Sequence, residues 1–287
     1  MTYGWAILVI AVVLGVLFQL GVFGSANLTP KAAPGGCQVE RTTAGTSLAG
    51  MCQGELPQYV AVFTGTSNSF VSIGTPSTVY SAFESHSFTV TGWVYITGST
   101  QGALFNVGEP PTNNVFEALA TTSGSNCGIE WYDWSFYICS ASALSTNTWY
   151  FLAWTYQYVG NSNTNYAAGY IDGQLATSST TAPPIASSTN FPICINEDYS
   201  PCTYNDGFFF PAAYMSNIQV YNTSLSSAEV LALYHEGIGG APVSPQSIVG
   251  WWPLNSNTND YSGNNDNGQS VNGVGYSGFW TNGYSAP

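Results

Sequence analysis

The sequence predicts an all-β sandwich preceded by one hydrophobic N-terminal α-helix. Short runs of β-branched and aromatic residues recur from residue 59 onward, with turn residues between them. Residues 3–24 are apolar and carry no charge. Aromatic residues make up 15% of the 287 residues, which is enough to fill a large core. In chain order we expect a transmembrane or filament-core helix (1–24), a stalk (25–57), the sandwich (58–237), and a linker with a terminal strand (238–287).

The first predicted element is the helix of residues 1–24. About 20 apolar residues, at a rise of about 1.5 Å each, span the hydrocarbon core of a bilayer. A secretory signal normally has a basic start and a shorter apolar run, so we expect this segment to be retained. Ala11, Gly15 and Gln19 lie on one face of the helix and would allow close packing and a hydrogen bond between helices. The alternatives are a lone lipid anchor and helix packing in a membrane bundle or filament core.

The predicted stalk, residues 25–57, is rich in Gly, Ala, Pro, Ser and Thr and has no periodic apolar pattern. Cys37 and Cys52 would tie part of it together. Asn27 begins one acceptor sequence for N-linked glycan, and Asn222 begins another after the last sandwich strand. We therefore expect glycosylation at both positions.

Six cysteines fall in close pairs along the chain: Cys37 and Cys52, Cys127 and Cys139, Cys194 and Cys202. The sequence does not fix their connectivity, although pairing within each short loop is the simplest choice. Their spacing is unlike that of a zinc site, and no histidine lies within any of the three pairs. Disulfides persist in oxidising compartments, so the sandwich is expected to lie outside the cell.

Several runs in the sandwich region have the composition of strands: 59–63, 69–73, 87–96, 129–138, 149–158, 169–176 and 214–221. The third run alternates strictly and places Phe88, Val90, Val94 and Ile96 on one face. Run 169–176 contains an Asp-Gly turn between two strands. A helix is predicted to follow these strands. It would begin with a capping box at Ser226 and Glu229 and end at Gly237.

These runs, in this order, resemble the concanavalin A-like, laminin G-like sandwich family. The stretches that carry the resemblance are "AVFTGTSNSFVSI", "FTVTGWVYI", "NTWYFLAWTYQ", "GYIDGQLA" and "MSNIQVYNTSLSSAEVLALYHEG". The resemblance implies a jelly-roll fold over residues 59–237. It also implies carbohydrate binding, through exposed Trp or Tyr side chains, and calcium binding as the family's common roles.

The segment "GWWPLNSNTNDYSGNNDNG" usually opens a domain of that family, but here it comes near the end of the chain. Trp251, Trp252 and Leu254 would form the strand that is otherwise missing from the sandwich. The segment folds back into its own domain as a circular permutation, completes a neighbouring copy, or is the stub of a second domain. The stub is disfavoured because it would leave an adhesive strand edge exposed.

Charge excludes some functions. Two basic residues face fifteen acidic ones, so nothing could neutralise the phosphates of a nucleic acid. The charged fraction of 6% leaves a hydroxyl-rich surface, which suits an acidic environment and fits an archaeon from a harsh habitat.

Glycosidases need paired carboxylates, but Glu130 and Asp133 point to opposite faces of one predicted strand. We expect no enzyme.

A calcium ion is the one cofactor that the sequence suggests. Asp260, Asn264 and Asp266 recur at alternate positions in an Asn-rich loop, as oxygen ligands do in a calcium loop. The loop departs from an EF-hand, because Asn265 stands where glycine is required. The alternative is an Asn-Gly turn without a metal. Glu197 and Asp198 add acidic groups in another loop.

These observations predict a non-catalytic, extracellular structural protein. In the first interpretation the chain is the subunit of a pilin-like cell-surface filament and displays the laminin G-like domain for adhesion. Its partners would be copies of itself and, through the domain, surface glycans. In the second, the N-terminal helix anchors a single-copy lectin or adhesin in the membrane. The absence of a basic leader before Trp5 departs from type IV pilins.

Overall fold

The computed structural model describes residues 37–287 except 44, 51, 53–55, 65–68, 85, 99–100, 110–112, 123–126, 134–135, 186–191, 198–201, 203–209, 211 and 282. The chain divides into two units, residues 1–33 and 34–287, and every described residue belongs to the second. The predicted helix with Ala11, Gly15 and Gln19, and the sequon at Asn27, therefore lie outside the described residues. Within the described part of the chain, no helix has the length and apolar character needed to cross a bilayer.

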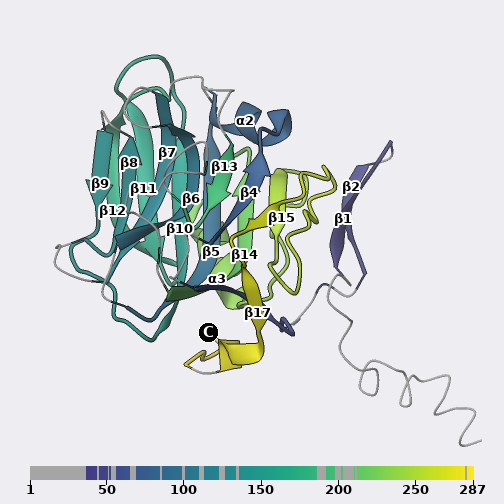
Figure 1. Ribbon diagram of the computed structural model, residues 1–287. Helices are drawn as coiled ribbons and strands as arrows, with labels where there is room; N and C mark the ends of the chain where they lie inside the picture. The colour runs from purple at the N-terminus through teal and green to yellow at the C-terminus, as the bar shows by residue number, and fades with distance from the viewer. Residues whose placement is uncertain are drawn as a thin grey trace, which may run out of the picture. The chain divides into compact units, whose positions relative to one another are not determined.

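The larger of two facing antiparallel sheets has the strand order β12-β11-β10-β5-β14-β3-β17, with β15 also paired to β14. In Figure 1 β15 lies next to β14, with which it pairs. The strands are β3 (Val60–Thr64), β5 (Phe88–Ile96), β10 (Trp149–Gln157), β11 (Asn165–Ile171), β12 (Gln174–Ala182), β14 (Ala212–Tyr221), β15 (Ile248–Trp252) and β17 (Gly275–Ser277).

The smaller sheet has the order β16-β4-β13-β6-β7-β8-β9. Its strands are β4 (Phe70–Gly74), β6 (Gln101–Glu109), β7 (Asn113–Thr121), β8 (Ile129–Asp133), β9 (Phe136–Cys139), β13 (Ile193–Ile195) and β16 (Gln269–Val271). The all-β sandwich with jelly-roll character that the sequence predicts is therefore confirmed for the described residues.

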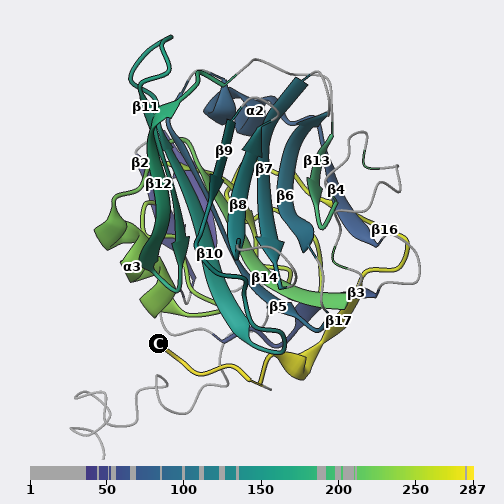
Figure 2. The same cartoon turned by 90° about the vertical axis from the view of Figure 1, so that its left-hand side faces the viewer.

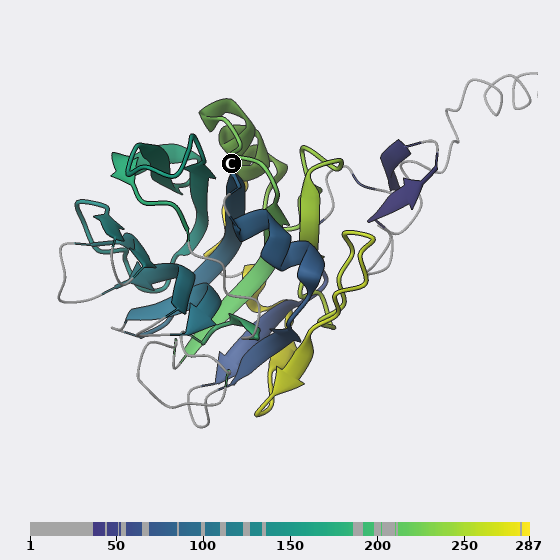
Figure 3. The ribbon, with the colours of Figure 1, turned by 90° about the horizontal axis from the view of Figure 1, so that it is seen from above.

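The main core lies between the two sheets, which Figure 2 shows as two layers. Phe88, Val90, Val94 and Ile96 of β5 all belong to this core, as their alternation predicts. The short helix α2 (Ser77–Phe83) adds Phe83, whose ring contacts that of Phe88 at 4.4 Å between centroids. Viewed from above in Figure 3, α2 lies over the space between the layers.

A second core covers the outer face of the larger sheet. Its cover includes α3 (Ser227–Glu236) and the 3-10 helix η2 (Gly278–Thr281), and Figure 2 shows α3 on the side away from the smaller sheet. Tyr234 of α3 stacks on Trp93 of β5 with 5.8 Å between ring centroids. The predicted capping box of Ser226 and Glu229 is present, and Gly237 ends the helix at φ 82°.

The C-terminal strand β15 pairs with its own chain. β14 is bulged near Asn217, and one of its edges is shared by two partners. β3 pairs with the first half of that edge, Ala212–Met215, and β15 pairs with the second half, Ile218–Tyr221. Without β15 the second half would be an open strand edge of the kind that promotes association between chains. In this structure the segment therefore completes its own sandwich.

The strand predictions need several corrections. Part of the predicted stalk forms a hairpin of β1 (Gln38–Thr42) and β2 (Gly45–Ala49), with Val39 buried against the second core. The run 129–138 is two strands, β8 and β9, because Trp131 and Ile138 both face the core at an odd spacing that one straight strand cannot provide. Strand β6 was not predicted, since Gly and Asn interrupt its apolar pattern, and neither were β7 and the short strands β13, β16 and β17.

Candidate functional site

A groove of about 510 Å³ lies on the outer face of the larger sheet, beside the beginning of α3. It exists because the outward side chains of β10 change character along the strand. Trp149, Phe151 and Ala153 are buried in the second core, whereas Thr155 and Gln157 line the groove. The apolar cover of the sheet ends at this change. The outer face at the end of β10 is therefore open to a ligand.

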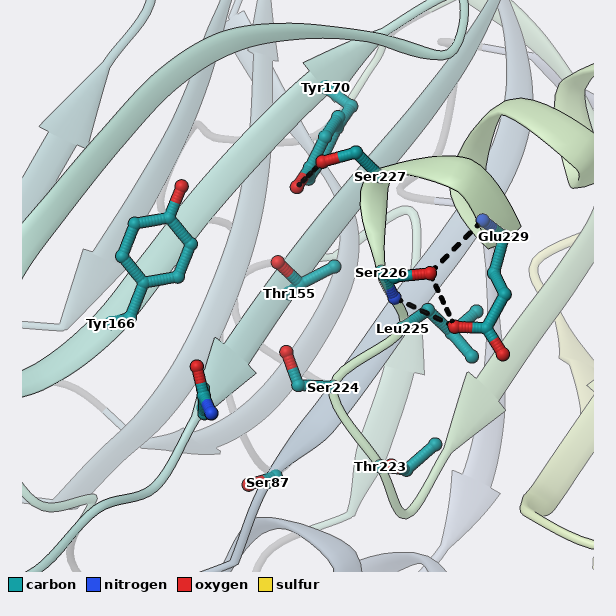
Figure 4. Close-up of a pocket in the computed structure, with 11 residues that line it drawn as sticks. Ser87, Thr155, Tyr166, Tyr170, Thr223, Ser224, Leu225, Ser226, Ser227 and Glu229 are labelled. Atoms are coloured by element: carbon teal, nitrogen blue, oxygen red, sulfur yellow. Dashed lines mark hydrogen bonds between the residues drawn. The ribbon is translucent and has the colours of Figure 1, made fainter.

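The neighbouring strand β11 supplies two tyrosines. Tyr166 lies opposite Gln157 in the strand register and is half-buried. Tyr170 is buried, and its hydroxyl lies 3.2 Å from Ser227 Oγ at the beginning of α3. In Figure 4 the Tyr166 ring stands on the side of the groove opposite the helix, with Thr155 and Ser224 between them. The tyrosines thus form an aromatic wall with polar ends.

The loop between β14 and α3 forms the other wall of the groove, and hydrogen bonds to the underlying sheet hold it in place. Thr89 Oγ1 donates to the Thr223 carbonyl at 2.8 Å and accepts from the Leu225 amide at 2.9 Å. Ser87, which precedes β5, also lines the groove and accepts a bond from the Tyr158 amide at 3.0 Å. These bonds tie the loop to the sheet, so its hydroxyl groups are held in place before a ligand arrives.

The capping box fixes the charged group of the groove. The Ser226 amide and hydroxyl both donate to Glu229 Oε2 at 2.8 Å, and Ser226 Oγ accepts from the Glu229 amide at 3.3 Å. These bonds from Ser226, the backbone one first, hold the pKa of the Glu229 carboxyl below its usual range. Glu229 is therefore ionised at neutral pH and in mild acid, and the groove has negative charge at its helical end.

Hydroxyl groups dominate the lining. Eight of the eleven described lining residues carry one: Ser87, Thr155, Tyr166, Tyr170, Thr223, Ser224, Ser226 and Ser227. A hydroxyl can both donate and accept, as a polyhydroxylated ligand requires; that of Ser226 already does both with Glu229. The volume lies in the range of about 300–1,000 Å³ that is usual for ligand sites.

A second hollow of about 550 Å³ differs in chemistry. It lies between the β1–β2 hairpin and the segment after α3, and its lining includes Leu48, Cys52, Pro242 and Val243. Glu236 is the one side chain with a hydrogen-bonding oxygen among the described residues that line it. Such a lining offers little to orient a polar ligand, so the groove beside α3 is the stronger candidate.

The predicted calcium residues lie together in the loop after β15, where they hold that loop in place. Asp260 accepts bonds from the amides of Trp251, Ser262 and Asp266 at 2.8–3.0 Å, and from the Ser262 hydroxyl at 2.8 Å. Asn264 donates to the carbonyl of Val249 at 2.8 Å. The side chain of Asp266 contacts Thr78 of α2 instead.

The next question is whether these side chains could also bind a metal ion. Within the described residues, no group of three or more His, Cys, Asp or Glu side chains is placed to hold a metal ion. The calcium site therefore stays a prediction, and the structure assigns Asp260 a role in fixing the terminal segment. Asp198, from the second acidic loop, lies outside the described residues.

The cysteines are joined in the three local pairs: Cys37–Cys52, Cys127–Cys139 and Cys194–Cys202. They serve three separate places in the domain, namely the β1–β2 hairpin, the β8–β9 edge and the β13 region. Such disulfides indicate an oxidising environment. Asn222, the predicted glycosylation position, is exposed directly before the groove residues Thr223 and Ser224.

Glu130 lies on the outer face of the smaller sheet. It does not line the groove, so it is not placed to act there as a catalytic acid. Its carboxylate accepts bonds from Gln101 Nε2 at 3.0 Å and Thr121 Oγ1 at 3.2 Å, and burial raises its pKa. The side chain of Asp133 is not described by the structure, so the predicted opposition of the two carboxylates stays a prediction.

The groove residues were not predicted from the sequence as a site. The available signal was the outward set of the run 149–158, which reads Trp, Phe, Ala, Thr, Gln and becomes polar at one end. The capping box was recognised as a helix start. Only the fold shows that this start lies over the polar end of β10.

Comparisons with known proteins agree with this fold. A family model described as the concanavalin A-like lectin/glucanases superfamily matches residues 65–231, more than half of the chain. No curated protein matches the sequence.

Two solved structures are similar. One is a protein of Bacteroides ovatus ATCC 8483 described as a candidate carbohydrate-binding protein, with a TM-score of 0.58 and 17% identity. The match covers 83% of this chain and 65% of that one, just under two thirds of its length. The other is the heptameric SAP-like pentraxin of Limulus polyphemus, with a TM-score of 0.56, 14% identity, and coverage of 77% of this chain and 95% of the pentraxin. At these identities the likeness supports the fold alone.

Proposed function

The chain belongs to the concanavalin A-like lectin/glucanases superfamily, and we propose that its sandwich is a non-catalytic, extracellular module that binds glycans in the groove beside α3. The observation that carries the proposal is the lining, in which hydroxyl groups surround two tyrosine rings on a rigid sheet. Adhesion to a glycan-bearing surface is the role that such binding would serve.

The chemistry of the groove suits a sugar. A pyranose ring presents hydroxyl groups at its edge and a weakly polar face, so it needs both hydrogen-bonding partners and a flat apolar surface. Tyr166 supplies the surface at the open side, while the hydroxyls of Thr155 and Ser224 lie between it and the helix. Amphipathic aromatic rings supply such contact area while their polar ends stay solvated.

The groove supports binding rather than hydrolysis. Glycosidases of the common retaining and inverting types use two carboxyl groups about 5–9.5 Å apart. Glu229 is the one carboxylate among the described residues that line the groove, and its Oε2 is occupied by Ser226. A single carboxylate that is engaged in a helix cap cannot serve as both acid and nucleophile.

Tyr166→Ala tests the proposal, with Tyr137→Ala as the matched control. Tyr137 is 51% exposed on the smaller sheet and does not line the groove. The full chain is screened on an array of neutral and acidic glycans, and the strongest ligand is then titrated by calorimetry. We expect Tyr166→Ala to weaken binding at least about tenfold, an effect of about 1.4 kcal/mol, and Tyr137→Ala to leave it unchanged. The absence of any glycan ligand, or equal losses in both variants, would refute the proposal.

A more specific proposal is that the chain is the subunit of a pilin-like cell-surface filament. It rests on the uncharged run 3–24 and its stripe of Ala11, Gly15 and Gln19. The pairing of β15 within its own chain supports contacts between copies through these helices over strand donation. The alternative is a single-copy lectin anchored in the membrane by the same helix. Negative-stain microscopy of native material separates the two, since regular fibres that Gly15→Leu abolishes support assembly, and isolated particles contradict it.

A further inference from the structure

The charge of the groove defines which glycans it accepts. Its lining contains one ionised group, Glu229, and no lysine, arginine or histidine among the described residues. A ligand carboxylate or sulfate placed there would meet a like charge and no compensating cation. Like charges brought together at an interface suppress binding of the wrong partner.

We propose that the groove selects neutral glycans and rejects acidic ones, and that Glu229 is the residue that determines this specificity. This inference rests on the proposed glycan-binding function of the groove. It concerns the class of sugar, so uronic acids, sialic acids and sulfated sugars are the ligands excluded. Neutral hexoses and their oligomers are the ligands admitted.

The start of α3 is the one feature that could favour an anion instead. A helix N-terminus carries unpaired amides and the equivalent of about half a positive charge, and it commonly binds anions. In this chain the position is already taken. Glu229 accepts from the Ser226 amide and hydroxyl at 2.8 Å, and Ser226 Oγ accepts from the Glu229 amide at 3.3 Å. A full negative charge set against about half a positive one leaves this end of the groove negative.

The cations of the chain do not reverse this balance. Arg41 is the one lysine or arginine within the part of the chain that the structure describes, and it does not line the groove. Its guanidinium donates to the carbonyl of Ser262 at 3.0 Å and to that of Ile248, both in the C-terminal segment. Arg41 is therefore committed to the fold. The net charge of −13 adds a long-range bias against anions.

Glu229→Gln is the variant that isolates the charge. Glutamine fills the same position in a capping box, since its amide oxygen accepts the bond from the Ser226 amide. The helix start should thus be kept while the negative charge is removed. Thermal unfolding followed by circular dichroism checks that the variant folds.

The probes are derived from the strongest neutral oligosaccharide found on the array. The first is that oligosaccharide, the second is the same molecule with its C6 hydroxymethyl groups oxidised to carboxylates, and the third is the methyl ester of the second. The ester has the size of the acid without its charge. Affinities of the full wild-type chain and of Glu229→Gln are measured by calorimetry at low salt and in 1 M NaCl.

We expect the wild type to bind the acid at least about tenfold more weakly than the neutral ester, and the difference to shrink in Glu229→Gln. High salt should also reduce it, because salt screens exposed charges over about 3 Å at 1 M. Equal or tighter binding of the acid by the wild type, or array ligands that are all acidic, would overturn the inference while leaving glycan binding intact. A preference unchanged in Glu229→Gln would remove the role of Glu229. The absence of any glycan ligand would instead refute the proposed function, and the inference with it.

Discussion

Replacing Trp252 by alanine would show how far the C-terminal segment contributes to the sandwich core. The Trp252 side chain is 0% exposed and belongs to the core between the two sheets. Its ring lies 6.3 Å from that of Phe105 on the opposite sheet, and its Nε1 donates to the Asp266 carbonyl at 2.9 Å. A Cβ at Gly250 would lie 2.2 Å from this ring, so the glycine leaves the space in which the indole packs.

The magnitude follows from burial. A buried aromatic side chain removes about 150–250 Å² from water, and at about 25 cal/mol per Å² this is worth about 4–6 kcal/mol. Measured Trp-to-Ala replacements in cores cost about 3–5 kcal/mol, because the surroundings relax in part. The lost bond to Asp266 adds about 1 kcal/mol. We expect Trp252→Ala to lower the free energy of unfolding by about 4 kcal/mol.

The assay is unfolding in guanidinium chloride followed by far-ultraviolet circular dichroism, which does not depend on tryptophan emission. Trp280→Ala is the matched control, because Trp280 in η2 is only half-buried and should cost about 1–2 kcal/mol. At about 2–4 °C per kcal/mol, the melting temperature of Trp252→Ala should fall by about 8–16 °C. A loss below about 1 kcal/mol, or one no larger than that of Trp280→Ala, would mean that the segment does not complete the core.

Three further measurements test other parts of the structure. Arg41→Met should cost about 1 kcal/mol and the loss should be smaller in high salt, because the side chain is exposed although its guanidinium bonds to the C-terminal segment; equal stability in chemical denaturation would contradict this role. Asp260→Asn should cost about 1–3 kcal/mol, since an amide nitrogen would face donors that the carboxylate now accepts, and a chelator should not reproduce the loss in melting temperature. Burial raises the pKa of the carboxyl groups of Glu130, Asp172 and Asp266. Their contribution to stability is fully present below the unfolded pKa values of about 4 and is lost as pH rises through the native ones. Glu229, with its lowered pKa, acts in the opposite sense, because its contribution is present above the unfolded value and lost as pH falls through the native one. With three raised values against one lowered, denaturation at pH 5 should give a stability at least equal to that at pH 7, and a clear loss at pH 5 would contradict this balance.

The strands with strict alternation were predictable, and the reason is visible in β5. Phe88, Val90, Val94 and Ile96 face the smaller sheet, and the outward set includes Trp93, which α3 covers. Apolar residues on both faces of β5 indicate a strand that is covered on both sides. By contrast, the residues around Glu117 in β7 read Val-Phe-Glu-Ala-Leu-Ala without alternation, so this sequence does not separate strand from helix.

The position of the C-terminal segment was only partly predictable. The paired indoles of Trp251 and Trp252 indicated a missing strand, but pairing in its own chain and pairing in a neighbour require the same local pattern. In this structure the segment pairs within its own chain, on a β14 edge that the bulge at Asn217 divides between β3 and β15. Trp251 Nε1 donates to Asn217 Oδ1 at 2.8 Å, so the bulge also anchors the arriving strand. No periodicity in the segment itself contains this information.

The groove was beyond sequence reasoning for a related reason. Ser226 and Glu229 could be assigned to a helix cap from their spacing, and Thr155 to a strand, but their meeting depends on where the loop after β14 crosses the sheet. Thr89 on β5 decides that crossing by bonding both Thr223 and Leu225. A threonine near the start of an alternating strand looks like any other β-branched residue until its partners are known.

The β1–β2 hairpin contacts the segment that carries β15 and the loop after it. β15 pairs with β14 on one side, and its Trp251 and Trp252 side chains are buried in the second core and the main core. The Val39 amide of β1 donates to the Tyr261 carbonyl at 2.9 Å, and Arg41 bonds to two further carbonyls of the same segment. The Cys37–Cys52 disulfide closes the hairpin that presents both residues. The region expected to be a stalk therefore acts as a clasp on the C-terminal strand, which explains why a chain with so few cations places one of them there. If that is its role, reducing this disulfide should weaken the packing of Trp251 and Trp252 before it affects β5 and β10, and amide exchange measured strand by strand would detect that order.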